Sequence, residues 1–159
     1  MKSWLLLLAL VAAPGLAQQR ESLVTARVTI AGEVKRELAL TVEDLRALGR
    51  RRSVVEMRGY AGVRLIDLLE EADIRRDARH ALRRTYVVAT ASDGYLAVFS
   101  WGELFNTPVG AGVLVAFERD GEALRDGEGR IALVSLADER PSARHVKWLR
   151  KIDVRRVPD

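Results

Sequence analysis

Basic side chains gather near the end of the sequence, where together they could bind an anion. Arginine binds phosphate through two parallel N–H donors, and lysine adds a compact positive charge. The alternative is an exposed strand edge, where charged side chains discourage aggregation. On charge alone, this second interpretation is favoured. The cluster consists of Arg140, Arg144, His145, Lys147, Arg150 and Lys151.

Two tryptophans and one turn could add contacts to a ligand. Trp101 and Trp148 could stack on a heterocycle, although the neighbours Val146 and Leu149 favour a core position for Trp148. The segment Ser92-Asp-Gly-Tyr95 could face a ligand, but as a bare pattern it indicates only a hairpin turn. None of these features identifies a ligand by itself.

Several classes of active site are excluded by the residue types. The sequence contains no cysteine and only two histidines, His80 and His145, so a zinc site built from several histidines and cysteines is excluded. It has no glycine-rich phosphate loop. A Ser-His-Asp triad is not supported, because no nucleophile-elbow sequence is present. We therefore assign no catalytic residue and no metal ligand.

Length and charge indicate one domain with a mildly basic surface. The chain has 159 residues and a net charge of +4, with 26 basic residues interleaved among 22 acidic ones. A basic surface could favour anionic ligands or nucleic acid. The interleaving favours an ordinary solvated surface, and no nucleic-acid recognition motif is present, so we expect no nucleic-acid partner.

The first 17 residues have the pattern of a secretory signal peptide. Lys2 supplies a positive start, residues 4–13 form an apolar run, and the small residues up to Ala17 suit cleavage after that position. The run is shorter than the roughly 20 apolar residues of a membrane-spanning helix. An uncleaved anchor is the alternative. We expect a periplasmic or secreted protein with no integral membrane span after cleavage.

Hydrophobic periodicity predicts a mixed α+β domain. Alternation predicts strands over residues 23–30 and 34–40 that pair as a hairpin. Further strands are expected over 53–57, 85–91, 95–100, 113–117 and 131–135, with a loop over 73–84. The Asp-Gly pair between the strands 85–91 and 95–100 predicts a second hairpin.

Helix-start signals predict three short helices. Thr41 and Asp44 form a capping box before a helix over 42–48, with Gly49 as its stop. A second helix is expected over 64–73 from its apolar spacing. Ser100 and Glu103 form another capping box before a helix that ends near residue 106.

Three segments, in order, carry a resemblance to a known family. They are Tyr60-Ala-Gly-Val-Arg-Leu-Ile-Asp-Leu-Leu69, then Asp93-Gly-Tyr95, then Ala143-Arg-His-Val-Lys-Trp-Leu149 with Ile152. Together they resemble the oxidoreductase molybdopterin-binding domain of the sulfite oxidase family. The resemblance covers residues 22–156 and implies one such domain with mixed β-sheets and short helices. It also implies a molybdopterin cofactor and two-electron oxidoreductase chemistry at molybdenum.

The sequence departs from the family at the metal ligand. In that family a cysteine thiolate, a short way before the first segment, holds the molybdenum. Here Val54, Val55 or Glu56 stands at about that position. Glu56 offers a hard carboxylate, and Met57 offers only a weak thioether. The loop 136–143 also lacks the Pro-Gly pair that is common in the family. The departure argues against ordinary ligation of molybdenum and against ordinary sulfite oxidation.

The resemblance implies a set of residues that bind the pterin. Arg144, His145 and Lys147 are expected at its polar end, and Ser92 and Asp93 near its ring. An open pocket lined by the three basic side chains would favour this function.

The alternative function is a non-catalytic periplasmic module. Such a module keeps the fold without the cofactor and binds or interacts with a periplasmic protein partner. A pocket filled by Met57, Tyr60 and Trp148 would favour it.

Overall fold

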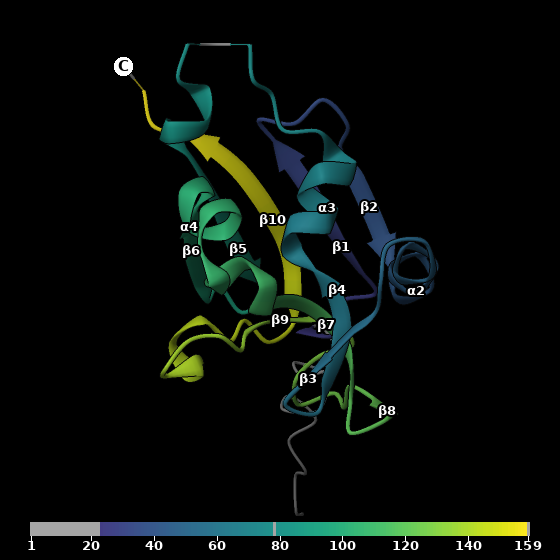
Figure 1. The fold of residues 1–159 in the computed structure, drawn as a ribbon. Coiled ribbons are helices and arrows are strands. Elements are labelled where there is room, and N and C mark those ends of the chain that lie inside the picture. Colours follow the sequence, from purple (N-terminus) through teal and green to yellow (C-terminus); the bar gives the residue numbers. More distant parts are fainter. Residues whose placement is uncertain (1–22, 78, 159) are drawn as a thin grey trace, which may run out of the picture.

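The computed structural model describes residues 23–77 and 79–158, and two five-stranded sheets form its body (Figure 1). Short helices lie beside the sheets, so the α+β prediction is confirmed. The segment 1–17, predicted as a signal peptide, lies outside the described residues.

The first sheet has the strand order β2-β1-β10-β5-β6. Its central strand β10 runs parallel to β1 and antiparallel to β5, although β1 and β10 come from opposite ends of the chain. The two predicted hairpins, β1–β2 and β5–β6, are both present in this sheet. The strands are β1 (Arg27–Gly32), β2 (Leu38–Thr41), β5 (Thr85–Ala91), β6 (Leu96–Ser100) and β10 (Leu149–Arg156).

The second sheet is antiparallel and has the order β3-β4-β7-β8, with β9 also paired to β7. An isolated bridge between Leu133 of β9 and Val146 ties it to the segment that leads into β10. The basic C-terminal segment is thereby fixed against both sheets. The strands are β3 (Val55–Met57), β4 (Tyr60–Arg64), β7 (Val113–Arg119), β8 (Glu122–Ala123) and β9 (Ala132–Ser135).

Both helix-start predictions at capping residues are borne out. Asp44 N–H donates to Thr41 Oγ1 at 3.3 Å, and Thr41 N–H donates to the Asp44 carboxylate at 2.9 Å. Among the described residues, no helix is both long and apolar enough to cross a membrane. The helices are α2 (Val42–Arg51), α3 (Leu65–Ala72) and α4 (Trp101–Asn106), with short 3-10 turns η1 (Ala81–Arg84), η2 (Pro108–Gly112) and η3 (Pro141–Arg144).

The sequence predicts that helix α2 ends at Gly49, and this prediction is wrong. The helix continues to Arg51, and Gly49 is buried within it. A Cβ atom at Gly49 would lie 2.7 Å from a Val54 methyl carbon. The glycine therefore permits close packing of the returning chain, and it does not terminate the helix.

Strand β4 is not among the strands that the sequence predicts. Arg58 and Gly59 form a two-residue turn with φ angles of 50° and 80°, and Met57 pairs with Tyr60 across it. Positive φ at both central positions is the geometry that a tight β-hairpin requires. The predicted loop 73–84 likewise contains a short helix, η1.

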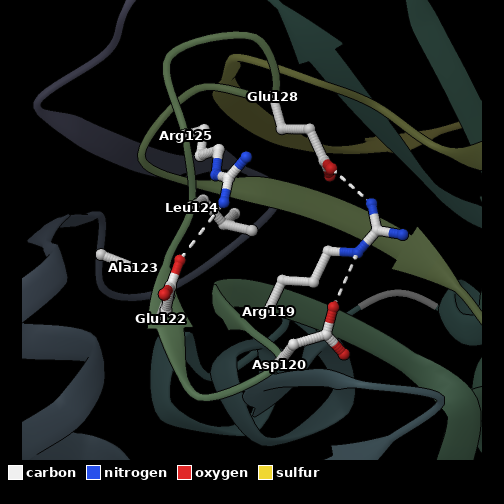
Figure 2. A pocket seen from close by; sticks show the side chains of 7 residues that line it. All are labelled: Arg119, Asp120, Glu122, Ala123, Leu124, Arg125 and Glu128. Atoms are coloured by element: carbon white, nitrogen blue, oxygen red, sulfur yellow. Dashed lines mark hydrogen bonds and ion pairs between the residues drawn. The ribbon is translucent and has the colours of Figure 1, made fainter.

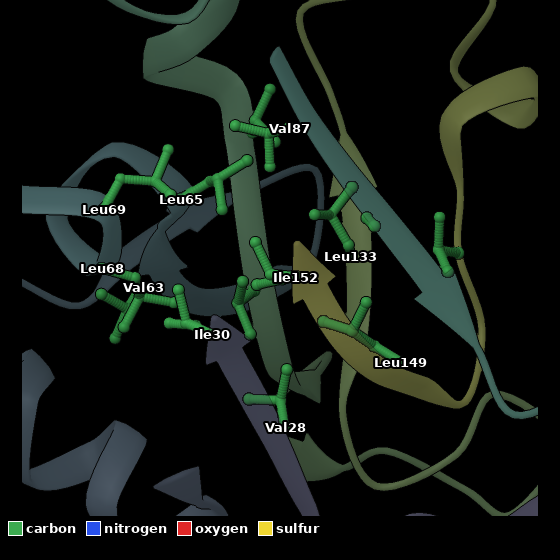
Figure 3. Packing of buried hydrophobic residues seen from close by; sticks show 14 of the residues in the cluster. Val28, Ile30, Val63, Leu65, Leu68, Leu69, Val87, Leu133, Leu149 and Ile152 are labelled. Carbon is green, nitrogen blue, oxygen red and sulfur yellow. The ribbon is translucent and has the colours of Figure 1, made fainter. Parts of the chain in front are cut away.

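The main core lies where the inner face of the first sheet meets α3 and the strands of the second sheet. Figure 3 shows Ile30 of β1, Ile152 of β10 and Val87 of β5 directed into this cluster, together with Leu65 and Leu133. All five side chains are fully buried. Because the chain has no cysteine, packing of this kind must supply its stability.

Truncation of the central strand should destabilise the whole domain. We expect Ile152→Ala to lower the free energy of unfolding by about 2–5 kcal/mol, because it leaves a cavity between β1 and β5. Denaturant titration measures this change. The control Val157→Ala, at a side chain that is 53% exposed, should change it by no more than about 0.5 kcal/mol. Equal effects of the two substitutions would contradict the assignment of the core.

Candidate functional site

A cleft of about 430 Å³ opens between the β3–β4 hairpin, the end of β7 and the segment after η3. Its volume lies within the range of roughly 300–1,000 Å³ that is typical of small-molecule sites. Three cations converge on it, and two of them, Arg58 and Lys147, form no ion pair with the described residues. The lining residues are Arg58, Tyr60, Arg119, Glu128, Val134, Leu136, His145 and Lys147.

Glu128 is the acidic residue that lines this cleft. Its Oε1 accepts a hydrogen bond from Arg119 Nη1 at 2.7 Å, and its Oε2 accepts one from the Tyr60 hydroxyl at 3.0 Å. The Arg119 guanidinium also lies 5.0 Å from the centroid of the Tyr60 ring. One carboxylate thus connects β4, β7 and the loop that carries it.

The electrostatics of the cluster favour a charged Glu128 beside a neutral Tyr60. Burial raises the pKa of Glu128, but the hydrogen bonds from Arg119 and Tyr60 outweigh it, so this pKa lies below its usual value. Burial and the nearby carboxylate raise the pKa of Tyr60 to about 12. Tyr60 therefore remains a hydrogen-bond donor at neutral pH.

His145 lines the cleft and is neutral at neutral pH, because its pKa is lowered. Burial is the main reason that its pKa lies below the usual value, and the Glu128 charge only partly opposes this. Its Nε2 lies 3.3 Å from Glu128 Oε2, but the angles do not meet hydrogen-bond geometry. With a neutral ring this contact is not an ion pair, and the buried Nε2 has no aligned partner among the described residues.

Trp148 holds the Glu128 loop in place. Its backbone N–H donates to the Glu128 carbonyl at 2.8 Å, and its ring Nε1 donates to the Asp126 carbonyl at 2.7 Å. Trp148 has a φ angle of 48°, which is strained for a bulky residue. Gly129, at φ 79°, permits this contact, because a Cβ there would lie 2.8 Å from Trp148 Cα.

A second hollow lies on the other side of the Arg119–Glu128 pair. Figure 2 shows Arg119 between Asp120 and Glu128, while Arg125 reaches toward Glu122. This hollow is lined by three acidic and two basic side chains, in contrast to the cation-rich cleft. The Arg119–Glu128 ion pair therefore lines both hollows.

The structure brings His145 and Lys147 to the cleft but directs Arg144 elsewhere. Arg144 Nε donates to Asp138 at 2.8 Å, and Arg144 Nη1 donates to Glu103 at 2.7 Å. Its guanidinium also lies over the Phe99 ring, 4.6 Å from the centroid. The hydrogen bond with Asp138 is the main reason that the pKa of Arg144 lies above its usual value.

Ser92 and Asp93 lie in the β5–β6 turn and do not line the cleft. Ser92 Oγ donates to the Leu23 carbonyl at 2.5 Å, and Asp93 Oδ1 accepts from Tyr95 N–H at 2.9 Å. The turn does contact the C-terminal segment, since Ser92 N–H donates to the Trp148 carbonyl at 3.0 Å. The role of these residues toward a pterin stays a prediction.

Four residues of the cleft were not identified from the sequence: Arg58, Tyr60, Arg119 and Glu128. Tyr60 stood in the first family segment but was treated as a possible filler of the pocket. No motif in the sequence marks Arg119 or Glu128 as a binding residue. The cross-strand pairing of Tyr60 with Arg119 brings them together, and no spacing along the chain encodes this register.

The residues near the expected thiolate do not fit molybdenum. Met57 packs against the smaller core cluster that contains Tyr60 and Leu114, and the Glu56 side chain is exposed. No group of three or more His, Cys, Asp or Glu side chains in the described part of the chain could hold a metal ion. Molybdenum bound to a pterin dithiolene favours a soft thiolate, which this sequence does not contain.

The sequence model of one protein family, the oxidoreductase molybdopterin binding domain, matches residues 52–159. The chain belongs to this family. Its structure is also similar to the sulfane dehydrogenase SoxCD from Paracoccus pantotrophus, with a TM-score of 0.57 and 24% identity. That match covers 80% of this chain and only 37% of the other, so it supports the fold alone. No curated protein matches the chain.

Loss of the Arg144 charge should destabilise the segment that carries His145 and Lys147. We expect Arg144→Gln to cost about 2–3 kcal/mol at neutral pH, because it leaves two partly buried carboxylates without their partner. The pKa of Asp138 is lowered mainly by its hydrogen bond with Arg144. This stabilisation is therefore complete above the unfolded pKa of roughly 4 and is lost as the pH falls through the lower folded pKa.

Urea titrations of both proteins across this pH range measure the difference. Arg125→Gln, at a side chain that is 88% exposed, is the matched control. A cost that does not change with pH would contradict the account of the pair.

Proposed function

We propose that this chain is an exported cofactor-binding member of its family. In this proposal the cleft holds the anionic end of a pterin, and no thiolate ligates molybdenum. The observation that carries the proposal is the pair Arg58 and Lys147, two cations that line one cleft and form no ion pair with the described residues. A pterin cofactor ends in a phosphate or a nucleotide diphosphate, which such cations suit.

The neighbouring side chains suit the same role. Lys147 and Arg58 would bind the phosphate end, and the neutral His145 and Tyr60 would supply uncharged polar contacts. We assign Arg144 a positioning role, because its ion pairs fix the start of the segment that leads to His145. When bound with its metal, the cofactor supplies two-electron chemistry. Since the donor set near Glu56 does not fit the metal, no step of a reaction is assigned here.

Export is proposed on the sequence pattern of residues 1–17. A charged start, a short apolar run and small residues before Ala17 support cleavage and a periplasmic or secreted location.

One observation favours the second function, a non-catalytic interaction module. Glu128 already places a carboxylate among the cations of the cleft, as a built-in anion. A module without a cofactor would use this carboxylate to neutralise the site permanently. A cofactor site requires instead that an incoming phosphate bind beside Glu128, through Arg58 and Lys147.

Substitutions that change the charge of the cleft separate the two functions. We expect wild-type protein to bind inorganic pyrophosphate, and Lys147→Ala to weaken binding about tenfold through the lost attraction. Glu128→Gln should tighten binding by a similar factor, because it removes the competing charge and keeps the side-chain volume. Isothermal calorimetry at constant ionic strength measures both changes.

The matched control is Arg83→Ala, which removes an exposed charge on η1. This substitution should leave the affinity unchanged. Wild-type and Glu128→Gln proteins that both fail to bind pyrophosphate would overturn the proposal and favour the interaction module.

A further inference from the structure

The first sheet has one face that is open to solvent. Phe99, Ala97 and Ile152 point to the core, so their strand neighbours point the other way. Leu96 is 53% exposed and Val98 is 48% exposed. The register aligns Thr29, Lys151, Thr90 and Leu96 in one row across four strands of this face.

One half of this outer face is cationic. Arg27, Arg150, Lys151 and Arg155 surround a hollow of about 620 Å³ in which Asp153 is the acidic member. Asp153 binds both Lys151, at 3.1 Å, and Arg155, at 2.9 Å. Arg27 and Arg150 form no ion pair with the described residues, so the positive charge of this half is left largely unbalanced.

The other half of the face is apolar and ends in an edge strand. Val88 of β5 lies opposite Val98 of β6, next to Leu96. Strand β6, with the sequence Leu-Ala-Val-Phe-Ser, carries no charged residue. Edge strands usually carry lysine, proline or a bulge that prevents pairing with another chain, and β6 has none of these. Exposed aliphatic side chains on the last strand of a sheet are typical of an interaction surface.

We propose that this outer face docks an acidic protein partner. Carboxylates of the partner would meet Arg27, Arg150 and Arg155, and its apolar side chains would cover Leu96 and Val98. Charge complementarity decides between the possible occupants. A second copy of the chain would bring the same positive charges to the interface. A nucleic acid would satisfy the cations, but its phosphate backbone offers nothing to bury the aliphatic half.

The size of the face predicts a weak complex. Five strands about 4.8 Å apart and roughly five residues long span about 20 by 17 Å. Such an area is about half of the ~800 Å² that each partner buries in a stable complex. We therefore expect a transient association that weakens as salt is added. The inference does not depend on a pterin in the cleft.

A short synthetic peptide that alternates glutamate and leucine is the probe, with a lysine–leucine peptide as its counterpart. In isotope-labelled protein, we expect the acidic peptide to shift amide signals of β1, β5, β6 and β10, and the basic peptide to shift none of them. The double substitution Arg27→Glu and Arg150→Glu should weaken binding about tenfold. Leu96→Ser with Val98→Ser should also weaken it.

Arg83→Glu, on η1 and outside the lining of this hollow, is a single charge-reversal control and should bind the peptide as the wild type does. Thermal unfolding of each variant confirms that it is folded. Amide shifts confined to other surfaces, or unchanged affinity in both double variants, would overturn the proposal. Tighter binding of a DNA duplex than of the acidic peptide would also overturn it. Sedimentation that shows a dimer lost on substitution of Leu96 and Val98 would assign the face to a second copy instead.

Discussion

The candidate site depends on one carboxylate, Glu128. It accepts hydrogen bonds from Tyr60 on β4 and Arg119 on β7. The ring of His145, which lies just before the central strand β10, is 3.3 Å from the same carboxylate. Side chains from three other segments, β4, β7 and the residues before β10, therefore meet at one charge. Trp148 fixes that charge by binding two carbonyls of the same loop, at the cost of a strained backbone. Strain of this kind persists only where the surroundings over-determine it, as they do here.

The position of the glutamate also explains why a cation-rich cleft is stable in this fold. Three cations close together repel one another, and the partly buried Glu128 carboxylate offsets part of that repulsion. Arg119 is neutralised by Glu128, whereas Arg58 and Lys147 line the cleft without an ion pair to the described residues. The same arrangement suits a site for an anion, and it requires no thiolate. The fold can thus form an anion-binding cleft without a cysteine.

Local patterns predicted much of the fold from the sequence. The predicted strand over 85–91 coincides with β5, and the capping boxes mark the starts of α2 and α4. The Ser100 box is only half formed, because the Glu103 side chain binds Arg144 instead of its own helix start. Long-range contacts therefore override a local signal. The prediction that Gly49 ends the helix fails for the same reason, because the glycine is needed for close packing against a Val54 methyl group.

The site was predictable only in part, because its residues are aligned by strand pairing. His145 and Lys147 were identified from the basic cluster, and both line the cleft. Arg144 does not line the cleft, because it forms ion pairs with Asp138 and Glu103 instead. Tyr60, Arg119 and Glu128 come together through the register of β4 with β7 and through the Trp148 anchor. Neither feature leaves a periodic signal in the sequence.

The measurement that tests the central claim most directly is the pterin and molybdenum content of the same purified sample. The protein would be produced in a host that makes molybdenum cofactor. Oxidation releases a fluorescent pterin derivative, and mass spectrometry of the metal quantifies molybdenum. The account predicts nearly one pterin per chain with far less molybdenum, and more molybdenum when cysteine replaces Val54, Val55 or Glu56. A chain without pterin, or a wild-type chain with equal amounts of pterin and molybdenum, would contradict it.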